Sequence, residues 1–340
     1  MPNKKQVLML FFLFSFCMSC FFIQGDYSIA ESQYVIKFAT VAPEGSTWVK
    51  HMRRLAKDIF DKSNGRIDFK IFPGAVLGDE LDVLRKIRVG QIDCAAFSGV
   101  GFGQILPMVR VLDLPFLFRN YQEIDMVHRQ LREFFASEFR KRGFELIAWA
   151  EVGNTHLLSK KPIIKVSDLS GLKVWTWSGD PIAKETFSAM GINPIPLAIT
   201  DVTTAINTGM IDTVYAPPLA ALALQWYTSM KYMTALPLVH STGAVLISSK
   251  FIKKLPGDLS DLLMSTFDLA MAELTSALRE QNKEAIELIR NSGVTIIPVP
   301  SAAVLNEFYR IHDRVAQKLM DDIYPGEVLH RVYDILKRPH

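Results

Sequence analysis

The chain has 340 residues, of which 49% are hydrophobic, 21% charged and 11% aromatic. This composition excludes a disordered chain, a collagen-like repeat and a small disulfide scaffold. Lysine and arginine together number 38 and aspartate and glutamate 35, so the formal net charge is only +3. That balance argues against the basic face of a protein that binds duplex nucleic acid. The length is sufficient for about two domains.

The amino terminus has the pattern of a secretory signal. Two lysines precede an uncharged, mostly apolar run over residues 7–23, and polar and small residues follow it. We expect a signal peptide over residues 1–30, cleaved after Ala30 or, as second choice, after Gly25. Two alternatives stay open, since the run is long enough for an uncleaved anchor and Cys20 is a candidate for lipid attachment.

The first part of the mature chain alternates strand and helix patterns. In chain order we expect a strand over 34–40, a helix from Ser46 to about Gly65, a strand over 67–72, a helix over 79–89 and a strand over 92–97. The third strand is largely apolar, as buried parallel strands are. This βαβαβ order predicts an α/β domain with an open sheet.

A second α/β unit follows. We expect helices over 121–142, 182–190 and 202–207, strands over 144–152, 173–177, 213–216, 245–248 and 294–299, and further helices from Val304 onward. Between the last two of these strands, residues 258–291 form one helical pattern, which at 1.5 Å per residue would be about 50 Å long. A single domain does not need such a helix, so we expect it to bridge two.

These elements predict an α/β clamshell of two lobes with a long helix spanning both. We place the first lobe in residues 31–152 and 241–280, and the second in residues 153–240 and 281–340. Ligands of such folds bind between the lobes, at the carboxyl ends of the strands.

The sequence contains none of the common catalytic or metal-binding patterns. None of the seven histidines is paired for zinc, and neither a Gly-x-Ser-x-Gly elbow nor a phosphate-binding loop occurs. Gly99 to Gly103 follows the third strand, but its spacing is wrong for a dinucleotide loop. We interpret it as a tight turn near a cleft. We therefore expect no enzyme, no cofactor and no metal.

Several motifs occur together in the order found in one family. They are Pro73-Gly74 with Leu77-Gly78, Gly90-Gln91-Ile92-Asp93, Leu114-Pro115-Phe116-Leu117-Phe118, Gly171-Leu172-Lys173-Val174, Pro194-x-Pro196 and Gly209-Met210-Ile211-Asp212. Over residues 34–325 the chain resembles the periplasmic solute-binding protein of a TRAP (tripartite ATP-independent periplasmic) transporter. The resemblance implies two α/β lobes, a periplasmic location, and delivery of a small molecule to a membrane permease.

The chain departs from this family where the ligand is usually held. The signature arginine, which binds the ligand carboxylate through two hydrogen bonds, is replaced by Trp175, and Thr155 stands where a second arginine is frequent. Residues 213–216, Thr-Val-Tyr-Ala, replace a stretch that commonly carries Glu and Asn. Val41 stands at a polar contact position and Ser98 at an acidic one.

These departures favour an apolar ligand, because an indole offers one neutral donor in place of a guanidinium. The residues that we expect to contact the ligand are Trp175, Trp177, Tyr215, Thr155, Phe97, Ser98, Val41 and Ala216. An apolar ligand that buries about 400 Å² would gain on the order of 10 kcal/mol before ordering costs. We therefore hypothesise a hydrophobic, lipid-like ligand such as a fatty acyl compound. A position of Trp175 outside the cleft, or another basic side chain pointing into it, would overturn this hypothesis.

Other interpretations stay open at this point. The face shared by Trp175 and Trp177 could belong to the core, and we assign the apolar run over 219–227 to the core or to the lobe interface. A polar uncharged ligand could be held by Ser98, Thr155, Asn154 and Ser178. A small organic acid with a non-standard anchor and a periplasmic scaffold without a ligand are further alternatives. The resemblance also includes a subgroup that pairs with a periplasmic lipoprotein of tetratricopeptide repeats.

Overall fold

The computed structural model describes residues 32–338, and from Tyr34 onward these residues form one compact unit. The predicted signal peptide over residues 1–30 and the candidate lipidation site Cys20 lie outside the described residues. Within residues 32–338, the structure has no helix that is both long and apolar enough to cross a membrane.

The predicted βαβαβ unit is present at the start of this compact part. It consists of β1 (Tyr34–Ala39), α2 (Thr47–Lys62), β2 (Ile67–Phe72), α3 (Glu80–Arg88) and β3 (Cys94–Ser98). Strand β1 pairs in parallel with both β2 and β3. Ser46 begins α2 by accepting a hydrogen bond from the backbone N–H of Val49, which satisfies one of the free donors at the helix end. The first half of the sheet is therefore confirmed.

Two long strands join this half of the sheet to a second half. They are β4 (Phe144–Ser159) and β9 (Val239–Ser248), which run antiparallel to each other, with a register shift between Glu151 and Gly153. Beyond the shift, β4 pairs with β7 (Thr213–Ala216) and β8 (Tyr232–Thr234), and β10 (Thr295–Ile297) pairs with β8. The second half of the sheet therefore consists of the carboxyl-terminal part of β4 together with β7, β8 and β10.

Both long strands extend further than their patterns predicted. The prediction ended β4 at Val152 and began β9 at Val245. The reason lies at Gly153, whose φ of 120° is a conformation that side-chain-bearing residues rarely adopt. A Cβ atom there would also lie 2.7 Å from the Asn282 side chain. The glycine therefore marks an irregularity within one strand and not its end.

Helices and short elements cover the sheet and connect its halves. Those before β5 are α4 (Gly99–Gly103), η1 (Pro107–Asp113), α5 (Tyr121–Arg140) and η2 (Val166–Leu169). Those that follow are β5 (Trp175–Trp177), α6 (Pro181–Ala189), β6 (Ile195–Leu197), α7 (Ile199–Asn207), α8 (Pro218–Ala223), η3 (Trp226–Ser229), α9 (Ser249–Ile252), α11 (Ala302–Leu319) and α12 (Gly326–Leu336). The tight turn predicted over Gly99 to Gly103 is wrong, because this segment is the buried helix α4.

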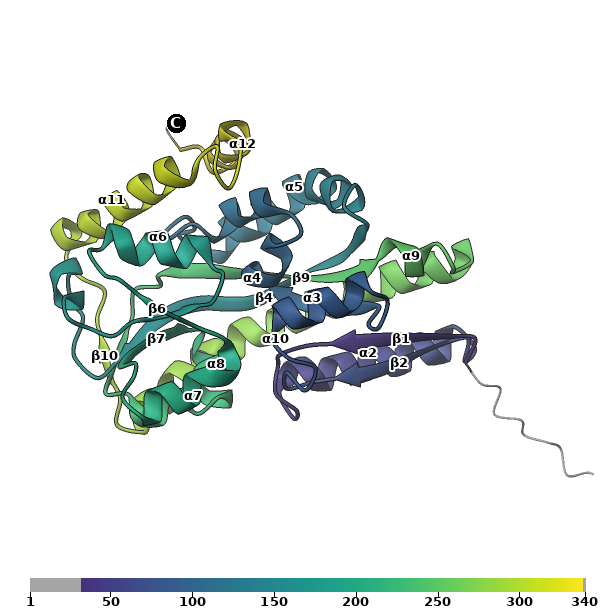
Figure 1. The fold of residues 1–340 in the computed structure, drawn as a ribbon, viewed down its shortest axis with the longest axis horizontal. Coiled ribbons are helices and arrows are strands. Elements are labelled where there is room, and N and C mark those ends of the chain that lie inside the picture. Colours follow the sequence, from purple (N-terminus) through teal and green to yellow (C-terminus); the bar gives the residue numbers. More distant parts are fainter. Residues whose placement is uncertain (1–31, 339–340) are drawn as a thin grey trace, which may run out of the picture. The chain divides into compact units, whose positions relative to one another are not determined.

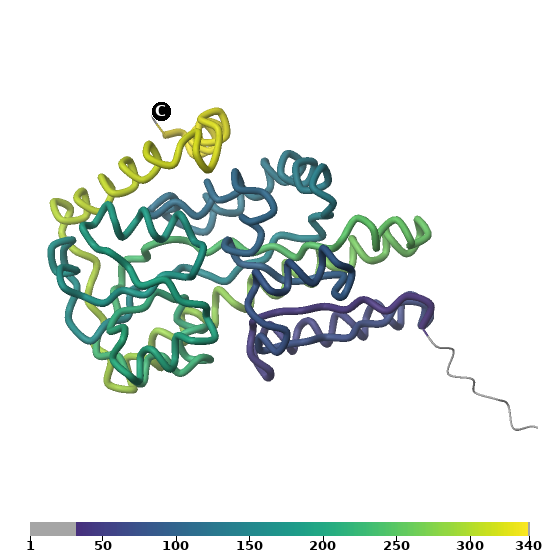
Figure 2. Tube along the Cα trace, in the orientation of Figure 1, coloured from purple at the N-terminus to yellow at the C-terminus, as the bar shows by residue number. Residues whose placement is uncertain are grey.

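The long helix is α10 (Gly257–Asn291), and it packs against α2, β4 and α8. Figures 1 and 2 show it running along one side of the sheet, from α2 toward α7 and α8. Near its start Leu263 is buried among residues of β1, α2 and β9, and near its end Ile289 is buried with residues of α7 and β7. The predicted spanning helix is therefore confirmed.

Candidate ligand-binding site

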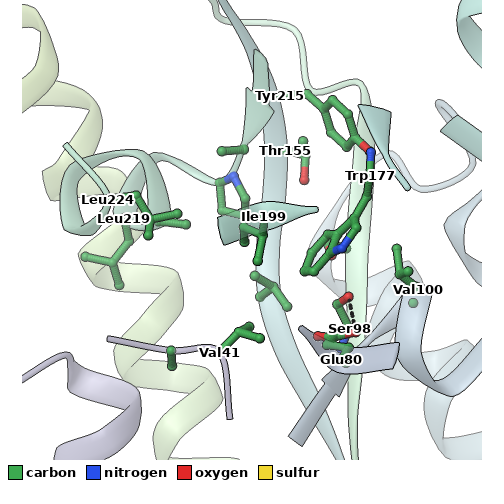
Figure 3. Close-up of a pocket in the computed structure, with 18 of the residues that line it drawn as sticks. Val41, Glu80, Ser98, Val100, Thr155, Trp177, Ile199, Tyr215, Leu219 and Leu224 are labelled. Carbon is green, nitrogen blue, oxygen red and sulfur yellow. Dashed lines mark hydrogen bonds between the residues drawn. The ribbon is translucent and has the colours of Figure 1, made fainter. Parts of the chain in front are cut away.

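A cavity of about 540 Å³ lies between the two halves of the sheet. This volume is within the range of about 300–1,000 Å³ that small-molecule sites have. The eight predicted contact residues all line it, namely Val41, Phe97, Ser98, Thr155, Trp175, Trp177, Tyr215 and Ala216. Figure 3 shows Tyr215 and Trp177 on one side of the cavity and Leu219, Leu224 and Ile199 facing them.

The topology brings these distant positions together. Val41 follows the carboxyl end of β1, Ser98 ends β3, Trp177 ends β5 and Ala216 ends β7. Carboxyl ends of strands are where open α/β sheets bind their ligands. Thr155 lies on β4 just beyond its register shift, so β4 contributes to the cavity lining between the strand ends of the first half of the sheet and those of the second.

Trp175 forms part of the cavity wall, but its ring is held by the protein. The residue is 2% exposed, and its indole N–H donates to the carbonyl of Leu197 at 3.1 Å. Its ring stacks on Tyr215 at 5.0 Å between centroids and meets Trp226 edge-on at 5.4 Å. The indole therefore offers an apolar surface, and its donor is already used.

Trp177 connects the two sides of the cavity. Its indole N–H donates to Asp79 Oδ2 at 2.8 Å, and Asp79 is the N-cap residue of α3 in the first half of the molecule. The backbone N–H of Trp177 donates to the hydroxyl of Tyr215 at 3.4 Å. Burial raises the pKa of Tyr215, so the phenol stays neutral at physiological pH.

The predicted polar contact Ser98 is engaged by a neighbouring carboxyl group. Its backbone N–H and its hydroxyl both donate to Glu80, at 2.8 and 2.9 Å, and the N–H of Gly101 donates to the same carboxyl at 2.8 Å. Burial raises the pKa of Glu80 to about 7, although these hydrogen bonds act in the opposite direction. Among residues 32–338, no hydrogen-bond partner is found for the Thr155 hydroxyl, which faces the cavity (Figure 3).

Arg110 on η1 also lines the cavity, and the sequence analysis missed it. Its side chain is 5% exposed; Nη2 donates to Asp180 Oδ1 at 2.7 Å, and Nε lies 2.9 Å from Asp113 Oδ2. A lone arginine in the apolar run over 105–117 was the available signal. The cavity thus contains a basic side chain, which is the observation stated above as contrary to the apolar-ligand hypothesis, and two carboxylates pair with it.

Asp113 is as deeply buried as Arg110. Its Oδ1 accepts a hydrogen bond from the backbone N–H of Thr242 on β9 at 3.2 Å. Burial raises the pKa of Asp113 to about 7, against the opposing effect of the Arg110 charge. The described lining therefore carries three carboxyl groups, those of Glu80, Asp113 and Asp180, and one guanidinium.

The apolar run over 219–227, which we expect in the core or at the lobe interface, also lines the cavity. Trp226 is buried in a hydrophobic cluster, but the run also supplies much of the apolar wall. Its lining residues are Leu219, Ala220, Leu222, Ala223, Leu224 and Trp226.

Two residues of the polar alternative, Asn154 and Ser178, are not part of the lining. Asn154 is turned instead toward His240, with 3.0 Å between Oδ1 and Nδ1.

Within residues 32–338, no cluster of three or more His, Cys, Asp or Glu side chains is arranged to hold a metal ion.

The family model "Bacterial extracellular solute-binding protein, family 7", DctP, matches residues 38–322. The chain belongs to this family, the DctP solute-binding proteins of TRAP transporters. Its members are periplasmic receptors and not enzymes, and they deliver small molecules to membrane permeases.

Relatives and solved structures support this membership and the fold. The C4-dicarboxylate-binding periplasmic protein DctP of Rhodobacter capsulatus is 24% identical over 84% of this chain and 87% of its own. The sugar acid binding protein DctPAm of Advenella mimigardefordensis, solved with galactonate, has a TM-score of 0.84 at 22% identity, covering 89% of this chain and 97% of that one. A TRAP solute-binding protein of Ralstonia eutropha, solved with (S)-2-acetolactate, has a TM-score of 0.83 at 24% identity, with coverages of 89% and 99%. The predicted two-lobed clamshell is therefore confirmed.

Proposed function

We propose that this chain is the periplasmic solute-binding subunit of a TRAP transporter and that it binds a hydrophobic ligand with an uncharged head. The ligand occupies the cavity between the two halves of the sheet, and the loaded protein delivers it to the membrane permease. The observation that carries the proposal is the pairing of Arg110 with Asp113 and Asp180, which leaves the described cavity lining without an unpaired cation.

The walls of the cavity support an apolar ligand body. Aromatic rings line one side and the aliphatic residues of 219–224 line the other. The indole N–H groups of Trp175 and Trp177 donate to protein acceptors, so neither is available for a ligand carboxylate. The Thr155 hydroxyl supplies one polar contact for an uncharged head.

An organic acid is the alternative, because the relatives and solved structures named above bind acids. For this chain Arg110 would be the anchor, and the acid would have to displace Asp180 from the guanidinium. It would enter a site that already contains the carboxyl groups of Asp113, Asp180 and Glu80, and above about pH 7 those of Asp113 and Glu80 are mostly ionised. The cost of burying a further unpaired charge disfavours this alternative.

Binding of the neutral, fluorescent apolar probe N-phenyl-1-naphthylamine tests the proposal. We expect saturable binding that octanamide displaces, and no thermal stabilisation by succinate, galactonate or (S)-2-acetolactate. Leu219→Asp places a charge in the apolar wall and is expected to weaken probe binding at least tenfold. Leu269→Asp is the matched control, since Leu269 is 67% exposed and lies outside the cavity. Stabilisation by one of the acids without probe binding would contradict the proposal.

The predicted partnership with a tetratricopeptide-repeat lipoprotein belongs to the same proposal. It is supported only by the absence of the family's carboxylate-binding arginine at Trp175. Affinity purification of the tagged protein from its native host tests it, and recovery of permease subunits without such a lipoprotein would contradict it.

A further inference from the structure

Arg110 is held in a site that the fold builds for it. In α4, a Cβ atom on Gly103 would lie 2.5 Å from Cδ of Arg110, and one on Gly99 would overlap Asp113 Oδ2. The two glycines are four residues apart and therefore share one face of the short helix. The Gly-x-Gly-x-Gly motif thus has a physical role, because its missing side chains leave the space that Arg110 and Asp113 fill.

Asp180 reaches the same guanidinium from the other half of the molecule. It is the N-cap residue of α6, where Oδ1 accepts hydrogen bonds from the backbone N–H groups of Ile182 and Ala183 at 3.0 and 3.2 Å. The same oxygen accepts from Arg110 Nη2 at 2.7 Å, and the side chain is 7% exposed. Three donors therefore fix the carboxylate against the arginine.

This arrangement places a protein carboxylate where a ligand carboxylate would otherwise bind. Arg110 and Asp180 both line the cavity, and Asp113 occupies the Nε side of the guanidinium. With both aspartates ionised, the group of three carries a net charge of −1. A carboxylate ligand would meet that charge in a region shielded from water, where like-charge repulsion is strong.

We propose that Asp180 determines the ligand specificity of this site by occupying Arg110 and so excluding carboxylates. Removing the charge of Asp180 then frees one side of the guanidinium and converts the cavity into a carboxylate site. This inference rests on the proposed function for the place of the ligand and for its uncharged head, and it adds the residue that sets the head-group preference.

Octanoate and octanamide are suitable probes, because they have the same size and shape and differ in charge. Wild-type protein is expected to bind octanamide more tightly than octanoate at pH 8 in isothermal titration calorimetry. In Asp180→Asn, octanoate affinity relative to octanamide is expected to rise at least tenfold. Asparagine is a good N-cap residue, so α6 keeps its capping hydrogen bonds.

Three further variants make the test specific. Asp180→Ser also caps α6 without a charge and serves if Asp180→Asn fails to fold. Arg110→Gln combined with Asp180→Asn is expected to abolish the gain, because the cation that binds octanoate is gone. Asp212→Asn makes the same charge change at a position outside the cavity lining, and its octanoate preference is expected to equal that of the wild type.

The outcomes separate this inference from the proposed function. Folded Asp180→Asn and Asp180→Ser proteins that bind octanamide as the wild type does, but octanoate no more tightly, would overturn the inference and leave the function intact. Absence of octanamide and naphthylamine binding in the wild type, together with octanoate binding in Asp180→Asn, would support the inference and refute the proposed apolar ligand.

Discussion

Replacing Arg110 by methionine would leave two buried carboxylates without their cation. The side chains of Arg110, Asp113 and Asp180 are 5%, 6% and 7% exposed, so water cannot solvate the charges that remain. Breaking a buried ion pair on one side costs about 3–5 kcal/mol. We expect the free energy of unfolding at pH 8 to fall by about that amount. Urea unfolding followed by tryptophan fluorescence would measure the change.

The dependence on pH distinguishes this cause from a packing defect. Without the cation, the buried carboxyl group of Asp113 binds its proton more tightly in the folded state, so the loss relative to wild type should shrink as the pH falls from 8 to 5. Arg85→Met is the control, because Arg85 is 69% exposed in its pair with Asp82, and such surface pairs contribute less than about 1 kcal/mol. A loss for Arg110→Met below about 1 kcal/mol, or a loss equal at both pH values, would refute the reasoning.

Two further predictions concern the cavity wall. Trp175→Ala should lower the free energy of unfolding by about 3–5 kcal/mol, because the indole is 2% exposed and packs between aromatic rings. Urea unfolding measures this loss, and a loss under about 1 kcal/mol would contradict the burial of the ring. Folding raises the pKa of Glu80 from 4.5 to about 7, so its contribution to stability is complete below about pH 4.5 and is lost as the pH rises to about 7. This loss is about 3 kcal/mol, and Glu80→Gln should show a shallower decline across that window; an unchanged slope would contradict the assignment.

The order of elements was accessible from the sequence because hydrophobic periodicity is local. The predicted strand over 213–216 coincides with β7, and the predicted helix over 258–291 agrees with α10 to within one residue. The eight predicted residues line the cavity because they stand at or near strand ends that meet there, and their contact with a ligand stays a prediction. The prediction of these residues thus depended on the α/β fold class and on the family resemblance, and both can be recognised from the sequence alone.

The charged part of the site was not accessible in the same way. Arg110 and Asp180 are 70 residues apart, and nothing in the local sequence of either predicts their contact. The glycines of α4 do not form the turn that their sequence predicts, for a related reason. Glycine usually indicates a turn, whereas here the backbone is helical and the missing side chains make room for groups from elsewhere in the chain.

The energetics of the paired arginine favour a role in ligand choice over a role in stability. Replacing a buried ion pair by well-packed apolar residues is often neutral or stabilises a protein by about 1–4 kcal/mol. An all-apolar wall would therefore serve an apolar ligand at no cost in folding. Such a wall would also accept the alkyl part of a fatty acid, whereas the group of Arg110, Asp113 and Asp180, with both aspartates ionised, carries a net negative charge that repels a carboxylate. On the proposed role of Asp180, the buried charges add electrostatic repulsion of a carboxylate to the cost of burying its charge in an apolar cavity.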